Sequence, residues 1–156
     1  MDDTDTELTP LHPNHVKVTR IVAALFALPF VIGSIVLEVV DVLPFGVFVV
    51  PVFLLAAFLV IRVPLRRYHA RGYDMGEDRL RVVRGILFRS DTVVPFGRIQ
   101  HIDVNQGPLQ RAYGIATLTV HTAGTHNASV HLPGLENSLA MDMREEIRAH
   151  IKRETL

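Results

Sequence analysis

Two long uncharged stretches near the N-terminus constrain the fold more than any other feature of this sequence. The first covers 17 residues from Ile21 to Leu37, and the second covers 20 residues from Val42 to Ile61. In the second stretch 15 residues are Leu, Ile, Val or Phe, and each of these favours membrane insertion by roughly 0.3–0.6 kcal/mol. Twenty helical residues reach about 30 Å, the thickness of the hydrocarbon core of a bilayer. The sequence therefore predicts two transmembrane helices.

A pair of helices in a soluble core and a cleaved signal peptide are the two alternatives to transmembrane helices. A helix that is apolar on every side has to be covered on every side, and the roughly 90 residues that follow are too few to do so. A signal peptide is disfavoured because the first stretch begins 20 residues into the chain and a second stretch follows it directly.

The charges that flank the two stretches predict their orientation. Lys17 and Arg20 precede the first stretch, whereas the four-residue linker from Glu38 to Asp41 carries only acids. Four arginines follow the second stretch: Arg62, Arg66, Arg67 and Arg71. Cytoplasmic loops carry the excess of Lys and Arg, so both termini are expected in the cytoplasm. Pro44 is expected in the first turn of the second helix, and Tyr68 and Tyr73 are expected at the membrane interface.

These patterns divide the chain into three parts. Residues 1–17, with acids at positions 2, 3, 5 and 7, are expected to be a flexible leader. Residues 18–63 are expected to form the transmembrane hairpin, and residues 64–156 are expected to form a cytoplasmic domain.

Alternating apolar and polar residues in the third part predict a mainly-β domain. The expected strands are Arg79–Val82, Ile86–Val94, Ile99–Asn105, Ile115–Thr122 and Ala128–Leu132, with Pro133-Gly134 closing the strand region. An amphipathic helix follows, with Asn137 or Ser138 as its N-cap and an apolar stripe at Ala140, Met143, Ile147 and Ile151. A helix covering the open face of an antiparallel sheet would bury that stripe.

Composition and the lack of several motifs exclude a number of functions. The 16 basic and 16 acidic residues balance, which argues against a nucleic-acid partner. With no cysteine there is no disulfide and no thiolate metal site. No nucleophile motif, phosphate-binding glycine loop or metalloprotease helix is present. We expect a protein that is not an enzyme and holds no cofactor.

Three histidines have two possible interpretations: they bind a metal ion, or they are side chains exposed to solvent on a hairpin. His121, His126 and His131 are spaced five apart across a predicted hairpin, with His126 at its centre. Directly opposed residues have Cβ atoms about 5 Å apart, so His121 and His131 would lie close enough to bind zinc. No carboxylate lies between them in sequence to complete the site. We therefore prefer the interpretation that these histidines are exposed to solvent on the hairpin and bind no metal.

Seven arginines are the candidates for binding an anionic ligand. Three follow the second apolar stretch, and four lie on or between the first two predicted strands: Arg66, Arg67, Arg71, Arg79, Arg81, Arg84 and Arg89. Bases beside an anionic leaflet are attracted by about 1 kcal/mol each. The alternative is that the first group only sets the topology and the second is a solvated strand face.

The centre of the chain resembles a known family. Arg98–Val104, Gln106–Arg111, Tyr113–Ala116 and Thr122–Gly124 are similar to the signature of the bacterial pleckstrin-homology-like (PH-like) family, and in particular of its membrane-anchored YdbS-like group. Two spans followed by such a domain is also the layout of that group. The resemblance extends from about Leu11 to Ile151, although Val-Thr-Arg precedes the first span where an aromatic residue is expected.

The resemblance implies a seven-stranded, partly open barrel capped by a C-terminal helix, and a binding or scaffolding function without catalysis. Its signature residues are expected to be structural: glycines in turns of positive φ, apolar residues in the core, and polar residues bonded to strand ends. They are Arg98, Ile99, Gln100, Ile102, Val104, Gly107, Pro108, Arg111, Gly114 and Gly124.

Two functions follow from the sequence. The first is a module of the bacterial inner membrane that docks another membrane protein, which the resemblance suggests is a larger multi-domain member of the same family. The second is a sensor of anionic lipids or of a small ligand that uses the seven arginines. Self-association of the chain is left open.

Overall fold

The computed structural model describes residues 8–40, 44–123 and 129–154. The chain forms two compact units: Val16–Arg66 is the first, and the second combines the residues up to His15 with those from Arg67 onward.

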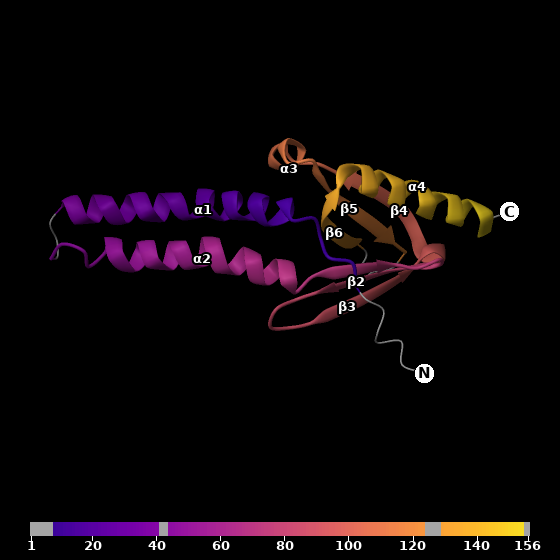
Figure 1. The fold of residues 1–156 in the computed structure, drawn as a ribbon, viewed down its shortest axis with the longest axis horizontal. Helices are drawn as coiled ribbons and strands as arrows, with labels where there is room; N and C mark the ends of the chain where they lie inside the picture. The colour runs from indigo at the N-terminus through magenta and orange to yellow at the C-terminus, as the bar shows by residue number, and fades with distance from the viewer. Residues whose placement is uncertain (1–7, 41–43, 124–128, 155–156) are drawn as a thin grey trace. The chain divides into compact units, whose positions relative to one another are not determined.

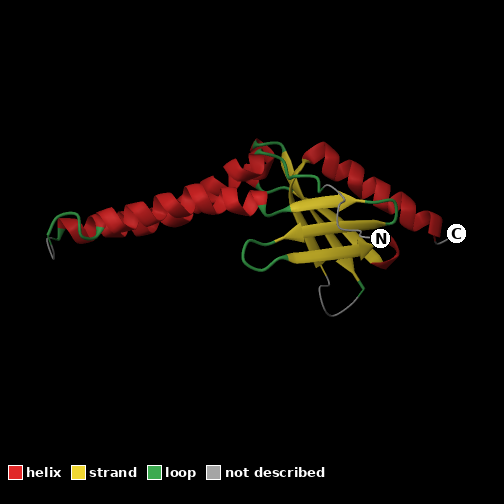
Figure 2. Cartoon of the chain, turned by 60° about the horizontal axis from the view of Figure 1, so that its bottom comes forward, coloured by secondary structure: helices red, strands yellow, loops and turns green. Residues whose placement is uncertain are grey.

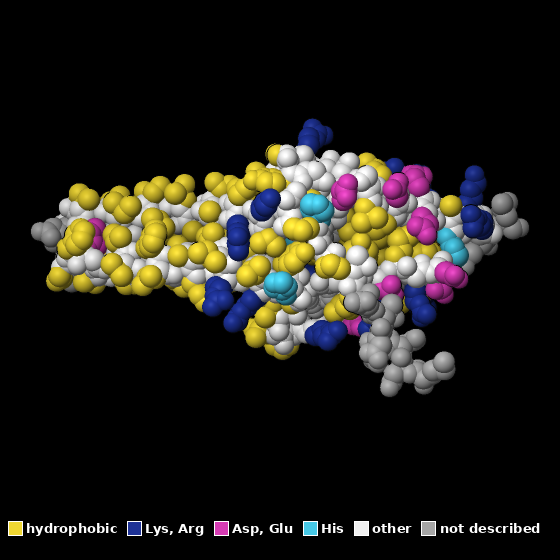
Figure 3. Space-filling view, viewed as in Figure 1, with side chains coloured by type: hydrophobic (Ala, Val, Ile, Leu, Met, Phe, Trp, Pro, Cys, Tyr) yellow, Lys and Arg dark blue, Asp and Glu magenta, His cyan; other side chains and the backbone are white. Residues whose placement is uncertain are grey.

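The first unit contains most of helices α1 (Asn14–Val39) and α2 (Val49–His69) (Figure 1). Both are long and apolar enough to cross a membrane, and only 6% of either apolar segment is buried. Hydrophobic side chains are the main coloured type along the visible surface of both helices (Figure 3). Phe26 and Phe30 are more than 70% exposed. A helix that is apolar and uncovered needs an apolar solvent. The described part of this chain therefore does not bury these helices in a soluble core.

The connection between the helices differs in detail from the expectation. Helix α2 begins at Val49, so Pro44 precedes the helix and Pro51 lies in its first turn. The carboxylate of Glu38 accepts hydrogen bonds from the backbone N–H groups of Gly46 and Val49. This acid therefore satisfies donors at and just before the start of α2, which have no helical acceptor.

The described residues of the second unit form strands β1–β6 and helices α3 and α4. Figure 2 shows the strands beside the long C-terminal helix. One antiparallel sheet has the order β1-β2-β3 and the other the order β4-β5-β6. The elements are β1 (Gly72–Met75), β2 (Arg79–Arg84), β3 (Ser90–Pro95), the 3-10 turn η1 (Phe96–Arg98), β4 (Ile99–Asn105), α3 (Pro108–Ala112), β5 (Ile115–Thr122), β6 (Ser129–Glu136) and α4 (Asn137–Glu154). The described residues form two three-stranded sheets and no closed barrel, consistent with a PH-like fold.

The predicted strands β4 and β5 are confirmed at both ends, and two other boundaries are corrected. Residues 86–89 form a loop and not the start of β3, because Gly85 turns the chain with a φ of 119°. Strand β6 continues through Pro133-Gly134 to Glu136. Pro133 is tolerated there because the strand is irregular between its pairings with Leu118 and Ala116.

The apolar stripe of α4 closes the core, as its spacing predicted. Ala140, Met143 and Ile147 are at most 3% exposed, and they pack in one cluster with residues from both sheets, including Leu80, Leu118 and Val120. Apolar residues three or four apart lie on one helical face. The core therefore lies between the two sheets and α4.

Residues 8–15 pack against the β domain, unlike the flexible leader expected there. Thr9 pairs with Tyr73 through two backbone hydrogen bonds of 2.7 and 3.1 Å, and Leu11 is only 2% exposed. Gly134 lets the chain approach closely, since a Cβ there would lie 2.7 Å from the ring of His15. We call residues 8–15 the N-terminal arm. Residues 1–7 of the expected leader lie outside the described residues.

The arm also changes the role of the two tyrosines expected at the membrane interface. Tyr73 is 6% exposed and belongs to the core, and burial raises the pKa of its phenol. The hydroxyl of Tyr68 donates a 2.8 Å hydrogen bond to the carbonyl of Leu11. Tyr73 is therefore a core residue and Tyr68 holds the arm.

Candidate functional site

The loop between β2 and β3 exposes an apolar tip. Leu87 and Phe88 are each 90% exposed and Ile86 is 46% exposed. We call Ile86–Phe88 the hairpin tip. Gly85 shapes the loop, because a Cβ at this position would lie 1.8 Å from the carbonyl oxygen of Phe88. Consecutive apolar side chains with this exposure usually mark a contact surface.

Arginines surround the base of this loop. A hollow of about 530 Å³ is lined by Arg67, Arg71 and Arg84 together with the hairpin tip. A second hollow of about 360 Å³ shares Arg71 and adds Arg89. None of the described residues that line either hollow is an Asp or a Glu. We call Arg67, Arg71, Arg84 and Arg89 the arginine cradle.

Arg71 is the most enclosed member of the cradle. Its pKa is lowered below the ordinary value, first by burial and then by the charges of Arg67 and Arg84. Like charges gathered in a partly desolvated place disfavour one another. The cradle is therefore electrostatically suited to an anion.

The other arginine candidates do not join this cradle. Arg81 forms a two-pronged ion pair with Asp91 on the neighbouring strand, with a shortest distance of 2.6 Å, and this contact lowers the pKa of the Asp91 carboxyl. Arg79 pairs with Asp78 at 3.5 Å. Arg66 belongs to the other compact unit.

The strand register separates the histidines that the sequence suggested as zinc ligands. His121 lies opposite Ser129, and His131 lies opposite Thr119. The prediction that His121 and His131 are opposed is therefore wrong by two residues. His126 lies outside the described residues, and among those that are described no group of three His, Asp or Glu side chains is placed to hold a metal ion.

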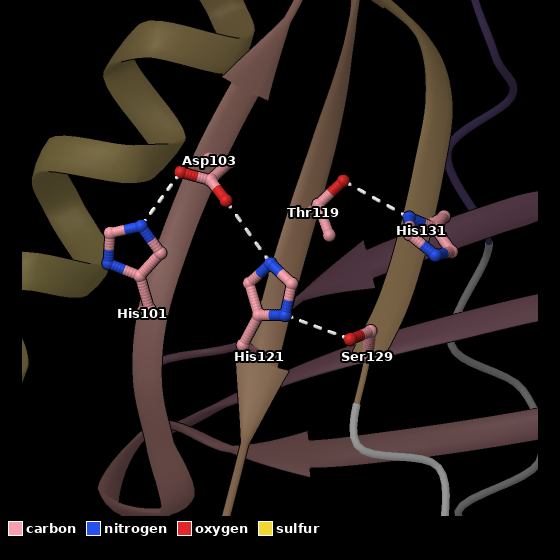
Figure 4. Close-up of polar contacts among 6 residues, drawn as sticks. All are labelled: His101, Asp103, Thr119, His121, Ser129 and His131. Atoms are coloured by element: carbon pink, nitrogen blue, oxygen red, sulfur yellow. Dashed lines mark hydrogen bonds and ion pairs between the residues drawn. The ribbon is translucent and has the colours of Figure 1, made fainter.

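A different polar cluster occupies the outer face of the second sheet (Figure 4). Asp103 on β4 contacts two histidines, with one oxygen 2.8 Å from His101 Nε2 and the other 3.2 Å from His121 Nε2. His121 Nδ1 lies 2.8 Å from the hydroxyl of Ser129, and His131 Nδ1 lies 3.1 Å from that of Thr119. Sequence spacing places no base beside Ser129, because this pairing depends on the β5–β6 register.

Ser129, His121 and Asp103 are the residue types of a nucleophilic triad. The surroundings argue against that chemistry, since the side chains of His121 and Asp103 are 38% and 41% exposed. Fixed charges act strongly on a reaction only where water is excluded. The cluster is better described as a solvent-exposed polar network that links β4, β5 and β6.

The signature residues divide between core, surface and loop positions. Ile99 is in the core, and Ile102 and Val104 are partly buried against it. Arg98, Gln100 and Arg111 are exposed. Two neighbouring glutamines make the structural bonds instead: Gln106 donates to the Ile115 carbonyl at 2.8 Å, and Gln110 bridges the Gly107 N–H and the Thr117 hydroxyl at 3.0 Å each.

The signature glycines differ in conformation. Gly114 has the expected positive φ, at 68°. Gly107, which precedes Pro108, is extended with a φ of −73°. The expectation that this position needs glycine because of a positive φ is therefore wrong. Gly124 lies outside the described residues.

Strand β3 is one of the edge strands in the part of the chain that the structure describes. Strand β3 pairs with β2 alone in its sheet, and Val93 in this strand is 48% exposed. The strand carries a single charge, Asp91, which Arg81 neutralises. Natural sheets usually protect an edge with charged side chains. The β3 edge is therefore a second candidate contact surface.

The sequence signal for the hairpin tip is ambiguous. Ile86-Leu87-Phe88 has the apolar character of a strand, and only Gly85 before it indicates a turn. The grouping of Arg67 and Arg71 with Arg84 and Arg89 depends on where the end of α2 meets the sheet, which periodicity does not reveal.

Comparisons with known proteins agree with this architecture. The family model described as "Bacterial PH domain" matches residues 16–151. A curated relative, the UPF0699 transmembrane protein YdbS of Bacillus subtilis, is 33% identical over 88 residues, which are 56% of this chain and 54% of the relative. The aligned part thus spans about half the length of that relative. No solved structure matches the chain.

The two apolar helices and the transmembrane relative identify a membrane protein. The family match covers the helices, both sheets and most of α4. The chain therefore belongs to the bacterial PH domain family, as a YdbS-like transmembrane protein.

Proposed function

We propose that this protein is a non-enzymatic binding module of the bacterial inner membrane, which docks a partner membrane protein at the cytoplasmic face. The observation that carries the proposal is the open, nearly uncharged edge of β3. A partner segment in extended conformation can add a strand there through backbone hydrogen bonds, with the half-exposed Val93 contributing specificity.

The absence of a catalytic role is part of the same proposal. The side chains of His121 and Asp103 are exposed to water, and Ser129 is the first residue of strand β6. Nucleophilic catalysis needs donors aimed at the developing oxyanion. In this proposal the cluster ties the three strands of one sheet together.

The cytoplasmic location follows from the flanking charges. Arg62, Arg66 and Arg67 lie in the last turns of α2, and Lys17 and Arg20 lie near the start of α1. The linker between the helices carries Glu38 and Asp41. The bias of Lys and Arg toward the cytoplasm then supports an inward-facing domain.

Site-specific photocrosslinking in native membranes tests the docking proposal. A photoreactive amino acid is placed at Val93, and a matched one at Met141, which is 38% exposed on α4. We expect the Val93 probe to capture one membrane protein in stoichiometric amount, and the Met141 probe to capture none. Equal capture at both positions, or none at Val93, would contradict docking at this edge.

A substitution pair adds a second readout. Val93→Lys places a charge on the open edge, as natural edge strands do, whereas Met141→Lys adds the same charge on α4. Co-purification of the captured protein is expected to fall with Val93→Lys and to be unchanged with Met141→Lys. Similar losses with both would indicate a general charge effect.

A further inference from the structure

We propose that the β2–β3 hairpin is a second membrane contact, in which the hairpin tip enters the lipid leaflet and the arginine cradle binds the phosphate of an anionic lipid. The proposal uses the loop and the arginines beneath it. It does not depend on docking at the β3 edge.

The hairpin tip has the exposure that membrane insertion requires. Leu87 and Phe88 are adjacent and both 90% exposed, so neither contributes to the core of the domain. Exposed apolar area is unfavourable in water in proportion to its size, and this area is concentrated at the end of one hairpin. Gly85 gives the loop a turn that no side chain at that position would permit.

The cradle supplies the matching charge. Arg84 is the last residue of β2, and Arg89 is the residue directly before β3. The hollow beside the tip also includes Arg67 and Arg71 on its walls. Guanidinium groups bind phosphate oxygens through paired, charge-assisted hydrogen bonds. With no carboxylate among the described residues of either lining, the charges of Arg67, Arg71 and Arg84 oppose one another until an anion is bound.

The short covalent connection between the arginine cradle and the membrane-spanning segment favours a lipid headgroup as the anion bound in the cradle. Arg67 follows Ile61, the last residue of the second apolar stretch, by six positions. A short tether keeps the cradle at a high effective concentration of headgroups, and each base near an anionic surface gains about 1 kcal/mol. A freely diffusing phosphate would explain the arginines but not the apolar tip.

The test uses the full-length protein in lipid nanodiscs with tryptophan as a reporter of depth. The chain contains no tryptophan, so Phe88→Trp introduces a single reporter, and Leu139→Trp on α4 is the control. Nanodiscs are made with phosphatidylcholine alone or with added phosphatidylglycerol, each with acyl chains brominated or unlabelled. We expect quenching by bromine for the Phe88→Trp indole in discs with phosphatidylglycerol, and none for the Leu139→Trp indole.

The arginine dependence is tested in the same discs. Arg67→Gln with Arg84→Gln is expected to lower the insertion equilibrium about 25-fold, or fivefold for each arginine, which corresponds to about 1 kcal/mol per base. Arg98→Gln with Arg111→Gln removes the same charge from exposed positions outside the cradle and is expected to have no effect.

Three outcomes would overturn the proposal. If the Phe88→Trp indole is unquenched in both lipid compositions, the hairpin tip does not enter the bilayer and would instead contact a protein partner. Equal losses with the two arginine pairs would reduce the cradle to a general charge effect. If inorganic phosphate added to phosphatidylcholine discs produced the same quenching, the anion would be a free phosphate and not a lipid headgroup.

Discussion

Leu11 ties an N-terminal segment into a domain that begins more than fifty residues later, and its truncation is the most informative stability test. Leu11 is 2% exposed and lies in the same core as Tyr73 and Leu132. We expect Leu11→Ala to destabilise the domain, since it removes a buried side chain and leaves a cavity. Buried Leu→Ala substitutions cost about 2–5 kcal/mol.

The structure places this value in the lower half of the range. The arm is held by two backbone hydrogen bonds between Thr9 and Tyr73 and one from the His12 N–H to the Gly134 carbonyl. A segment with so few bonds can move to fill part of the cavity, so we expect about 2–3 kcal/mol. Each kcal/mol lowers the Tm of a domain of about 100 residues by roughly 4–8 °C, giving a fall of roughly 8–24 °C.

The assay is thermal unfolding of the full-length protein in mild detergent, followed by tyrosine fluorescence. All three tyrosines lie in the β-domain unit and there is no tryptophan, so the signal reports on that unit. Leu87→Ala is the matched control, because it makes the same chemical change at a side chain that is 90% exposed. Equal Tm values for Leu11→Ala and Leu87→Ala would refute the conclusion that the arm completes the core.

Three further predictions concern the domain. The Asp91 carboxyl should titrate below the ordinary aspartate pKa in an NMR titration, because Arg81 binds its ionised form. The ion pair therefore stabilises the fold above the unfolded-state pKa of Asp91, and this stabilisation is lost as the pH falls through the lowered pKa. Both the lowered pKa and this pH dependence should disappear in Arg81→Gln. Gly85→Ala should lower the Tm more than Gly114→Ala. The added Cβ at position 114 has open space around it, so this substitution costs only the strain of a positive φ, about 1–2 kcal/mol. The added Cβ at position 85 would also clash with the carbonyl of Phe88. Zinc analysis of protein purified without chelators should return no stoichiometric metal, because the register separates His121 from His131; one zinc per chain would contradict this.

Local pattern was enough to predict much of the fold. The period-2 alternation of β4 and β5 is bounded by turn residues at both ends, and both strands match their predicted limits. The stripe Ala140, Met143 and Ile147 predicted the buried face of α4. Each of these signals lies within one segment, where side-chain spacing alone decides which face is buried.

The remaining features depend on contacts between segments distant in sequence. Strand β1 has four residues, too few for a periodic pattern, and the arm packs only because Gly72 and Gly134 leave space for it. The Asp103–His121 contact joins strands separated by α3. The cradle joins the end of α2 to both ends of the β2–β3 loop. Sequence spacing contains no information about such pairings.

The measurement that tests the proposed function most directly is the location of the domain relative to the membrane. The chain has no cysteine, so single cysteines can be introduced at Phe45, which is 95% exposed between the helices, and at Ser138 on α4. An impermeant maleimide is applied to intact spheroplasts and then to lysed ones. We predict that Phe45→Cys is labelled in intact spheroplasts and Ser138→Cys only after lysis. Labelling of Ser138→Cys in intact spheroplasts would contradict a cytoplasmic domain and, with it, both proposed contacts at that face.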